Sequence, residues 1–287
     1  MITVFTPTYN RAYCIENLYR SLLRQTDSDF EWVVVDDGST DNTEELISSF
    51  IADNEIRIVY LKQANGGKHT AINRGIDIAN GELFVIVDSD DYLTDDAIAV
   101  IRKTVEPIVD DDSYAGVIGL RRHHDGTLIS SGMMSDSVDA TTLDLRFTHA
   151  IKGDLAEVVK TEVFKKYKFP VFNGERFAPE ALIWNRIASD GLKFRLVNKS
   201  IYCCEYLSDG LTANIVKVRM KSPCGTVLCY SELSAMRVPF VQRFKAAINY
   251  WRFRSCAKEK TVGIDPRWIL AWPIGVLMHL NDLRITR

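Results

Sequence analysis

Along the first hundred residues, the hydrophobic and polar positions form a pattern that predicts strands separated by helices. Apolar runs of strand length occur at residues 2–5, 32–35, 56–61 and 83–87. Between the first two runs, apolar side chains recur at helical spacing, at Ile15, Leu18, Tyr19, Leu22 and Leu23. Strands that are apolar on both faces and alternate with helices predict a mainly parallel sheet that helices cover on both sides.

The pattern is weaker in the second half of the chain. It predicts a helix through residue 105, a strand at 115–120, a helix at 181–188, and strands at 194–197 and 201–206. Residues 127–180 give few clear signals. Beyond residue 215 a helical stripe is expected, formed by Phe240, Phe244, Ala247 and Trp251.

Composition is that of an ordinary globular protein, with 46% hydrophobic and 25% charged residues. The net charge of -3 gives no sign of nucleic-acid binding. The charge is unevenly placed, however, because residues 237–287 carry ten Lys and Arg against three Asp and Glu, a local excess of +7. This excess predicts a basic surface that faces an anionic partner.

The two ends of the chain carry no targeting or spanning pattern. The first residues lack a charged region followed by an apolar one, so no signal peptide is expected. The longest apolar stretch, residues 268–280, is shorter than the ~20 residues of a spanning helix. The six cysteines form no C-x-x-C pair and are expected to be free thiols. We expect a cytoplasmic protein.

Carboxylates follow two of the predicted strands directly. Asp36 and Asp37 end the second, and Asp88, Asp90 and Asp91 end the fourth. Because ligands bind beyond the carboxyl ends of parallel strands, these groups are expected in one cleft. A carboxylate cluster there suits a hard divalent cation that also binds phosphate oxygens. A solvated acidic turn is the alternative.

Four motifs together carry a more specific signal. They are Thr6-Pro7-Thr8-Tyr9-Asn10, Val35-Asp36-Asp37-Gly38-Ser39-Thr40-Asp41, Asn65-Gly66-Gly67-Lys68 and Asp88-Ser89-Asp90-Asp91. In this order and spacing they resemble the GT-A fold glycosyltransferases of family 2, over roughly the first hundred residues. The resemblance implies an α/β, Rossmann-like fold and a metal-dependent, inverting transfer from a nucleotide-diphosphate sugar to a saccharide or lipid-linked acceptor, in cell-surface polysaccharide synthesis.

The resemblance also implies roles for residues of the nucleotide site. Thr6, Pro7 and Tyr9 would form a wall against which the base lies, since the Tyr ring offers a flat apolar face. Asp37 would accept a hydrogen bond from the base. Lys68 would meet the base or the diphosphate as a point charge.

The Asp cluster corresponds to the family's Asp-x-Asp motif. Asp88 would belong to the donor site. Asp90 or Asp91 would be the direct ligand of Mn²⁺ or Mg²⁺.

The catalytic base is expected in the second half of the chain. In the family an Asp at the start of a helix takes the acceptor proton, four residues before a Trp or Leu. Aligning on Trp184 places Glu180 at that position and Pro179 where the family has Glu, with Pro179 expected at the first helical position. Glu175 and Asp154 are competing carboxylates.

The expected organisation is a catalytic domain over residues 1–215 and a basic, aromatic, mainly helical C-terminal extension over 216–287. Within the domain, residues 1–100 would bind the nucleotide sugar and residues 101–215 the acceptor. A loop at 209–212 is expected to close over the substrates. The extension would dock at the inner face of a membrane, pack on the domain or form a homodimer contact.

Two other functions are open. A sugar-nucleotide nucleotidyltransferase shares the nucleotide and the metal, but would show a Gly-rich loop after the first strand, which residues 6–10 lack. A non-catalytic saccharide-binding protein on the same fold would lose the Asp cluster, which is present here.

Overall fold

The computed structural model describes residues 1–131, 135–204, 214–257 and 261–285. These residues form two compact units. The sheet unit contains Met1–Lys168 and Asp190–Glu205, and the helical unit contains Phe169–Ser189 and Tyr206–Arg287.

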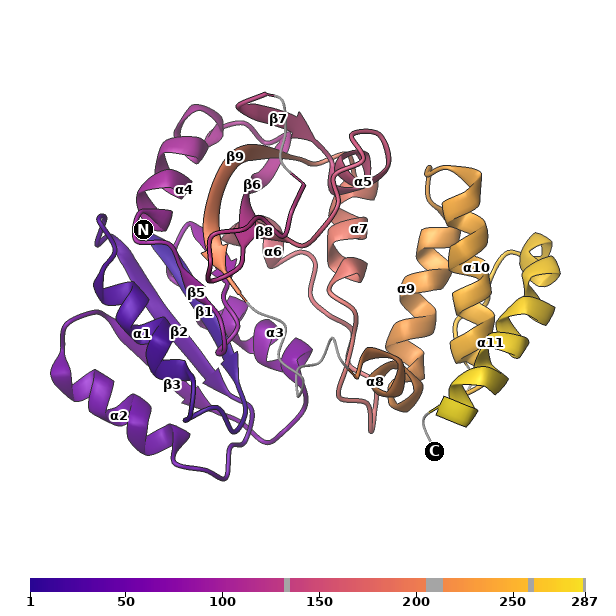
Figure 1. The fold of residues 1–287 in the computed structure, drawn as a ribbon, viewed down its shortest axis with the longest axis horizontal. Helices are drawn as coiled ribbons and strands as arrows, with labels where there is room; N and C mark the ends of the chain where they lie inside the picture. Colours follow the sequence, from indigo (N-terminus) through magenta and orange to yellow (C-terminus); the bar gives the residue numbers. More distant parts are fainter. Residues whose placement is uncertain (132–134, 205–213, 258–260, 286–287) are drawn as a thin grey trace. The chain divides into compact units, whose positions relative to one another are not determined.

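The described residues of the sheet unit form one sheet in the strand order β3-β2-β1-β4-β8-β6-β9-β5, with β7 paired to β9 (Figure 1). The strands are β1 (Ile2–Thr8), β2 (Phe30–Asp36), β3 (Ile58–Lys62), β4 (Leu83–Ile86), β5 (Tyr92–Leu93), β6 (Tyr114–Arg122), β7 (Ser137–Ala140), β8 (Leu155–Lys160) and β9 (Lys193–Cys203). Strands β1 to β4 are mutually parallel. Because β8 is antiparallel to both β4 and β6, strands β6 and β9 run in the same direction as β1.

Helices cover both faces of this sheet, as the alternating pattern predicts. The helices are α1 (Ile15–Leu23), α2 (Thr43–Asp53), α3 (Lys68–Ile78), α4 (Ala97–Val105), α5 (Thr142–Phe147) and α6 (Thr161–Phe164), and a 3-10 turn, η1 (Glu106–Ile108), follows α4. On one face, Leu18 of α1 and Ile98 of α4 pack with Val4 of β1. On the other, α3 lies so close to β1 that a Cβ at Gly75 would fall 2.1 Å from the Phe5 ring. The predicted fold class is confirmed.

The second half of the sheet differs from its sequence-based prediction. The two strands expected at 194–197 and 201–206 are one bulged strand, β9, since the polar residues Asn198 and Lys199 interrupt the hydrophobic pattern without ending the strand. Strand β8 lies in the segment with few signals, although four of its six residues are buried. It was missed because six residues between polar neighbours give little periodicity.

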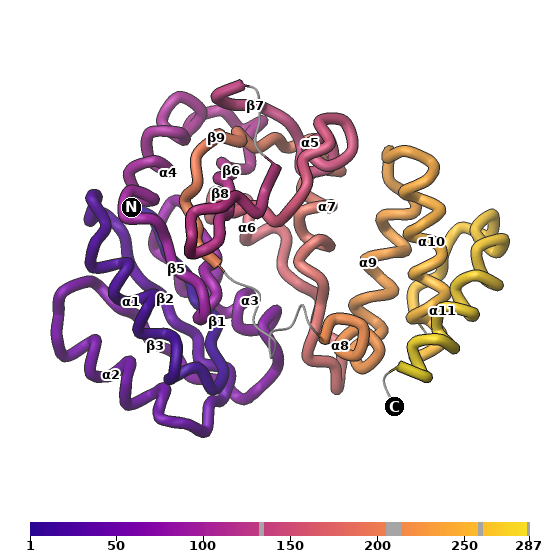
Figure 2. Tube along the Cα trace, in the orientation of Figure 1, coloured from indigo at the N-terminus to yellow at the C-terminus, as the bar shows by residue number. Residues whose placement is uncertain are grey.

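The helical unit contains α7 (Ala181–Ser189), α8 (Ile215–Lys221), α9 (Pro223–Ala235), α10 (Phe240–Arg254), a 3-10 segment η2 (Pro266–Ala271) and α11 (Trp272–Ile285). Helices α9, α10 and α11 run side by side (Figure 2). The C-terminal helical extension is thus present. The aromatic stripe of α10 packs largely within the extension, where Phe244 and Ala247 contact Trp268. Among the described residues, no helix is both long and apolar enough to cross a membrane.

Candidate functional site

The carboxyl ends of β1, β2, β4, β6 and β9 meet at one edge of the sheet, because these strands are parallel. The loops after β1 and β2 are tied together there. Asn10, which adopts a left-handed φ of 53°, accepts a hydrogen bond from the Thr40 amide at 2.8 Å and donates its own amide to Ser39 Oγ at 2.8 Å. The first two sequence motifs therefore form one structure.

Asp36 and Asp37 have different tasks although they are adjacent. Asp36 is fully buried and accepts hydrogen bonds from the Ser39 amide at 2.7 Å and the Tyr60 hydroxyl at 2.8 Å. It shapes the turn. Asp37 accepts hydrogen bonds from the side-chain amide of Gln63 and the backbone amides of Gly66 and Gly67, at 2.7–2.8 Å.

The Asp37 carboxylate thus holds the loop that begins α3. A carboxylate has about four acceptor positions, so three of them are occupied and one is left for a ligand. Gly67 has a φ of 94°, a conformation that favours glycine, and this conformation turns its amide toward Asp37. The two glycines before Lys68 are therefore explained by this carboxylate.

The proposed base wall is made of residues with very different exposure. Thr6 is fully buried, and its hydroxyl accepts a hydrogen bond from the Trp32 indole at 2.9 Å. Pro7 is buried too, whereas the Tyr9 ring is 46% exposed. A planar ligand at this edge would meet the Tyr9 ring, while Thr6 supports the strand from inside.

Lys68 and Asp88 are joined directly, with the Lys68 ammonium 2.6 Å from the Asp88 carboxylate. Burial by itself raises the pKa of Asp88, but the attraction of Lys68 and of Arg121 outweighs burial and leaves this pKa below its ordinary value. The pair links the third sequence motif to the fourth.

Asp90 lies beside Asp88 and is 20% exposed. Its carboxylate is 4.0 Å from the guanidinium of Arg11, which follows the first motif. Burial and the negative charge of Asp88 raise the pKa of Asp90 in spite of Arg11. A cation at Asp90 would relieve this repulsion.

Asp91 is buried, and its carboxylate is hydrogen-bonded by a side chain of β9, which lies much later in the sequence. The Tyr202 hydroxyl donates to Asp91 Oδ2 at 2.7 Å and accepts from the Asp88 amide at 3.0 Å. The Arg121 guanidinium lies over the Tyr202 ring, 4.1 Å from its centroid. Burial, reinforced by the Asp88 charge, raises the pKa of Asp91 to about 8. Sequence reasoning missed Tyr202 and Arg121, whose only signal was their place at strand ends.

The Asp cluster fits a divalent cation that is bound through few protein ligands. Within the described ranges, no three Asp, Glu, His or Cys side chains are arranged to hold a metal by themselves. Hard cations of the Mg²⁺ and Mn²⁺ type instead accept one or two carboxylates and complete their shell with phosphate oxygens and water. Of the two proposed metal ligands, Asp90 is the more exposed and Asp91 the more buried.

Removing the Tyr202 hydroxyl tests the support of this cluster. Tyr202→Phe leaves a buried carboxylate oxygen and a backbone amide unpaired, so we expect a loss of about 1–3 kcal/mol in stability. Metal-dependent affinity for a nucleotide ligand should fall about 10-fold or more, as for other residues that orient a metal ligand. Tyr114→Phe is the matched control, since its hydroxyl bonds Asp139 at 2.7 Å in the same unit. Equal nucleotide affinity in the two variants would contradict the assigned role.

The candidate base belongs to the helical unit. Helix α7 begins at Ala181, so Pro179 lies before the helix and not at its first position, and Glu180 directly precedes it. The Glu180 carbonyl accepts the Ile183 amide at 2.9 Å. Arg186 of α7 forms a bidentate ion pair with Glu232 of α9, at 2.9 and 2.6 Å, which fixes the helix.

The two competing carboxylates are in different situations. Glu175 accepts the backbone amides of Cys224 and Gly225 at 2.6 and 3.0 Å, and so satisfies the start of α9. Asp154 directly precedes β8 of the sheet unit. The loop expected at 209–212 lies outside the described residues.

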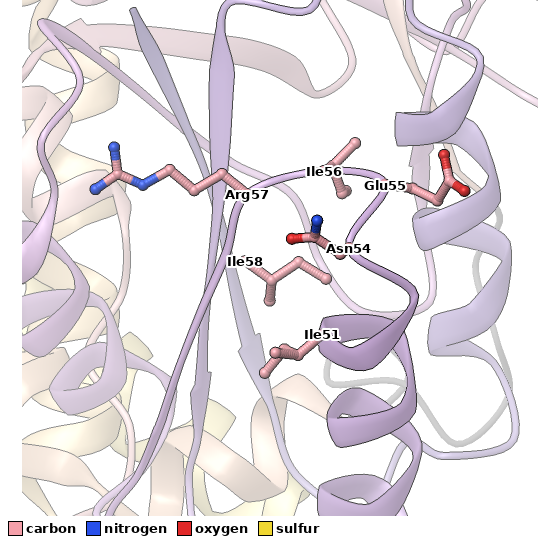
Figure 3. A pocket seen from close by; sticks show the side chains of 6 residues that line it. All are labelled: Ile51, Asn54, Glu55, Ile56, Arg57 and Ile58. Atoms are coloured by element: carbon pink, nitrogen blue, oxygen red, sulfur yellow. The ribbon is translucent and has the colours of Figure 1, made fainter.

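A surface hollow of about 340 Å³ lies elsewhere on the sheet unit (Figure 3). Ile51, Ile56 and Ile58 line it, together with Asn54, Glu55 and Arg57. These residues connect α2 to the start of β3, at the edge opposite the carboxyl ends of the strands. The hollow is therefore separate from the Asp cluster.

The sequence and the fold are similar to those of known proteins. The sequence profile described as glycosyl transferase family 2 matches residues 3–163. The chain is 27% identical to glycosyltransferase GlyG of Streptococcus pneumoniae, over 91% of this chain and 93% of that protein.

Two solved structures share the fold. TarS 1-349 of S. aureus, in complex with UDP-GlcNAc, aligns with a TM-score of 0.62 at 19% identity, over 96% of this chain and 79% of that chain. The mannosyltransferase PcManGT of Pyrobaculum calidifontis, in complex with GDP-Man and Mn²⁺, aligns with a TM-score of 0.59 at 20% identity, over 96% and 73%.

Proposed function

Because the chain belongs to glycosyl transferase family 2 and is a glycosyltransferase, we propose that it moves a sugar from a nucleoside-diphosphate sugar to a saccharide or lipid-linked acceptor. The transfer inverts the anomeric carbon, requires Mn²⁺ or Mg²⁺ and serves the synthesis of a cell-surface polysaccharide. Family membership favours this function over nucleotidyl transfer and over non-catalytic saccharide binding.

The observation that carries the proposal is the Asp cluster at the end of β4. Asp88, Asp90 and Asp91 stand together with Lys68 and Arg11, where the carboxyl ends of the parallel strands meet. The carboxylate side chains suit a divalent cation, and the basic side chains beside them suit a diphosphate, so the site suits a ligand that brings both. TarS with UDP-GlcNAc and PcManGT with GDP-Man and Mn²⁺ support the same ligand class here.

The remaining candidate site residues are each proposed to have a task in donor binding. The base lies on the Tyr9 ring and donates to the remaining acceptor position of Asp37. Lys68, oriented by Asp88, faces the diphosphate. Asp90 and Asp91 would hold the cation, which when bound would neutralise the charge that develops on the departing nucleoside diphosphate.

Glu180 is proposed to take the proton of the acceptor hydroxyl as that oxygen attacks the anomeric carbon. A single displacement from the face opposite the diphosphate inverts the configuration. Glu175 remains an alternative base, although its carboxylate also has a structural task, since it accepts two amides at the start of α9.

Thermal unfolding with a panel of nucleotide sugars tests donor binding. A donor present at about 100 times its Kd stabilises the fold by about 2.7 kcal/mol, which corresponds to a rise in Tm on the order of 5 °C. We expect this rise with UDP- or GDP-sugars and Mn²⁺, and a much smaller one with EDTA. An equal rise in EDTA would remove the metal from donor binding, and no rise with any donor would contradict the proposed site.

A further inference from the structure

Two polar side chains of α11, His279 and Asp282, face the rest of the helical unit, whereas Asn281 and Arg284 are exposed. Asp282 is 5% exposed and forms a bidentate ion pair with Arg252 of α10, with both distances 2.6 Å. His279 lies 3.6 Å from the Cys256 thiol. At Gly275 the two helices are so close that a Cβ would fall 2.6 Å from Trp251 Cβ. The packed side of α11 therefore includes a glycine and two polar residues.

The opposite side of α11 and the end of η2 are apolar and exposed. Leu270 is 78% exposed and Leu277 68%. The other exposed apolar residues of η2 and α11, which together with these two leucines form the surface that we term the outer face, are Ile269, Trp272, Ile274, Leu280, Leu283 and Ile285. A helix of a globular domain normally has the reverse arrangement, with its apolar stripe toward the core. Several large apolar side chains gathered on one surface indicate a binding surface.

Basic residues flank the outer face. Exposed Arg267 precedes Ile269, and exposed Arg284 follows Leu280 by one helical turn. The segment 237–287 has an excess of seven positive charges. Both of its acidic residues within the described ranges, Asp265 and Asp282, are already paired with arginines. Arg267 itself is the partner of Asp265, so the positive charge belongs to the segment as a whole, whose net charge is +7.

We propose that the outer face docks on an anionic lipid bilayer, with α11 lying in the plane of the membrane surface. Apolar burial at the acyl boundary and attraction to anionic headgroups act together on such a helix. The 14 residues of α11 span about 21 Å, less than the ~30 Å of the hydrocarbon core, so the helix lies along the surface. Trp272 suits the headgroup region.

The charge of the segment selects lipid over a second copy of the chain. A dimer formed through the outer face brings two segments of the same positive sign together, and this repulsion opposes association. An anionic bilayer complements the same charge. It also places the helical unit, which contains Glu180, at a surface where lipid-linked acceptors reside.

Vesicle co-sedimentation tests the proposal with the full chain. We expect the protein to sediment with vesicles of equal parts phosphatidylglycerol and phosphatidylcholine and to stay in solution with phosphatidylcholine alone. Salt at 0.5 M, where the Debye length is about 4 Å, should release it from the anionic vesicles. The double variant Leu270→Glu/Leu277→Glu should lower binding to anionic vesicles at least 10-fold. The matched control is Leu23→Glu/Leu128→Glu, which adds the same charge at exposed leucines of the sheet unit and should bind normally.

Circular dichroism and donor-induced thermal shifts show that each variant is folded. Since all four leucines are exposed, both double variants should keep these properties. If the wild-type protein stays in solution with both vesicles at low salt, the proposal is wrong. It is equally wrong if light scattering shows a dimer that only the Leu270→Glu/Leu277→Glu variant loses, because the outer face is then a contact between copies.

Discussion

Asp90→Ala is expected to reduce sugar transfer by about 10²–10³-fold, while the protein remains folded. Asp90 is more exposed than Asp91, the other proposed ligand of the cation, and its negative charge is opposed only weakly by Arg11 at 4.0 Å. Removing it takes away a proposed ligand of the cation that stabilises the leaving diphosphate, and one lost stabilising group of this kind costs 10²–10³-fold in rate. Steady-state release of nucleoside diphosphate measures the loss.

The control is Asp95→Ala, which removes an exposed aspartate paired to Arg24 in the same unit and should leave turnover unchanged. Because repulsion from Asp88 and burial disfavour the charged form of Asp90, its removal should not lower the Tm. Turnover that survives both Asp90→Ala and EDTA would exclude a metal from the reaction.

Glu180→Gln is expected to bind the donor normally and to transfer sugar about 10²–10⁴-fold more slowly, the usual contribution of a positioned proton acceptor. Glutamine keeps the shape of the side chain and cannot accept the proton. Donor thermal shifts and single-turnover rates separate the two effects. NMR of the product should show an anomeric configuration inverted relative to the donor.

Two further variants separate the candidate bases. Glu175→Gln should mainly lower the Tm, because it weakens the acceptor of two backbone amides at the start of α9. Asp154→Asn should leave the rate near that of the wild type. If Asp154→Asn is slow and Glu180→Gln is fast, the alignment on Trp184 is wrong and the base belongs to the sheet unit.

The first half of the fold was predictable because its signals are local. Strand β2 is a run of seven buried residues, and α1 repeats apolar residues at helical spacing. Because ligands bind beyond the carboxyl ends of parallel strands, the carboxylates after β2 and β4 could be placed at one edge of the sheet from the sequence alone. The positions of Asp37 and Asp88 at one edge follow from these two facts, whereas the role expected of Tyr9 came from the family resemblance.

The support of the site was not predictable, because it depends on pairings between distant segments. Tyr202 reaches Asp91 only because β9 runs parallel to β6 and ends at the same edge as β4. Its hydrophobic neighbours made it look like an ordinary core residue. Arg121 gave an equally weak signal, since an arginine at a strand end is usually a solvated residue. The outer face of α11 was hidden because the apolar residues of this helix show little helical periodicity.

The antiparallel strand β8 has a consequence for how the chain is synthesised. Strands β1 to β4 belong to the first 86 residues and pair with one another in parallel. Residues 83–85 of β4, however, can form their pairing with β8 only after residues 158–160 have been synthesised. At 5–20 residues per second the ribosome needs about 4–15 s to deliver them. During that interval the nascent sheet carries an open, apolar edge, which is the kind of surface that chaperones bind and that otherwise aggregates.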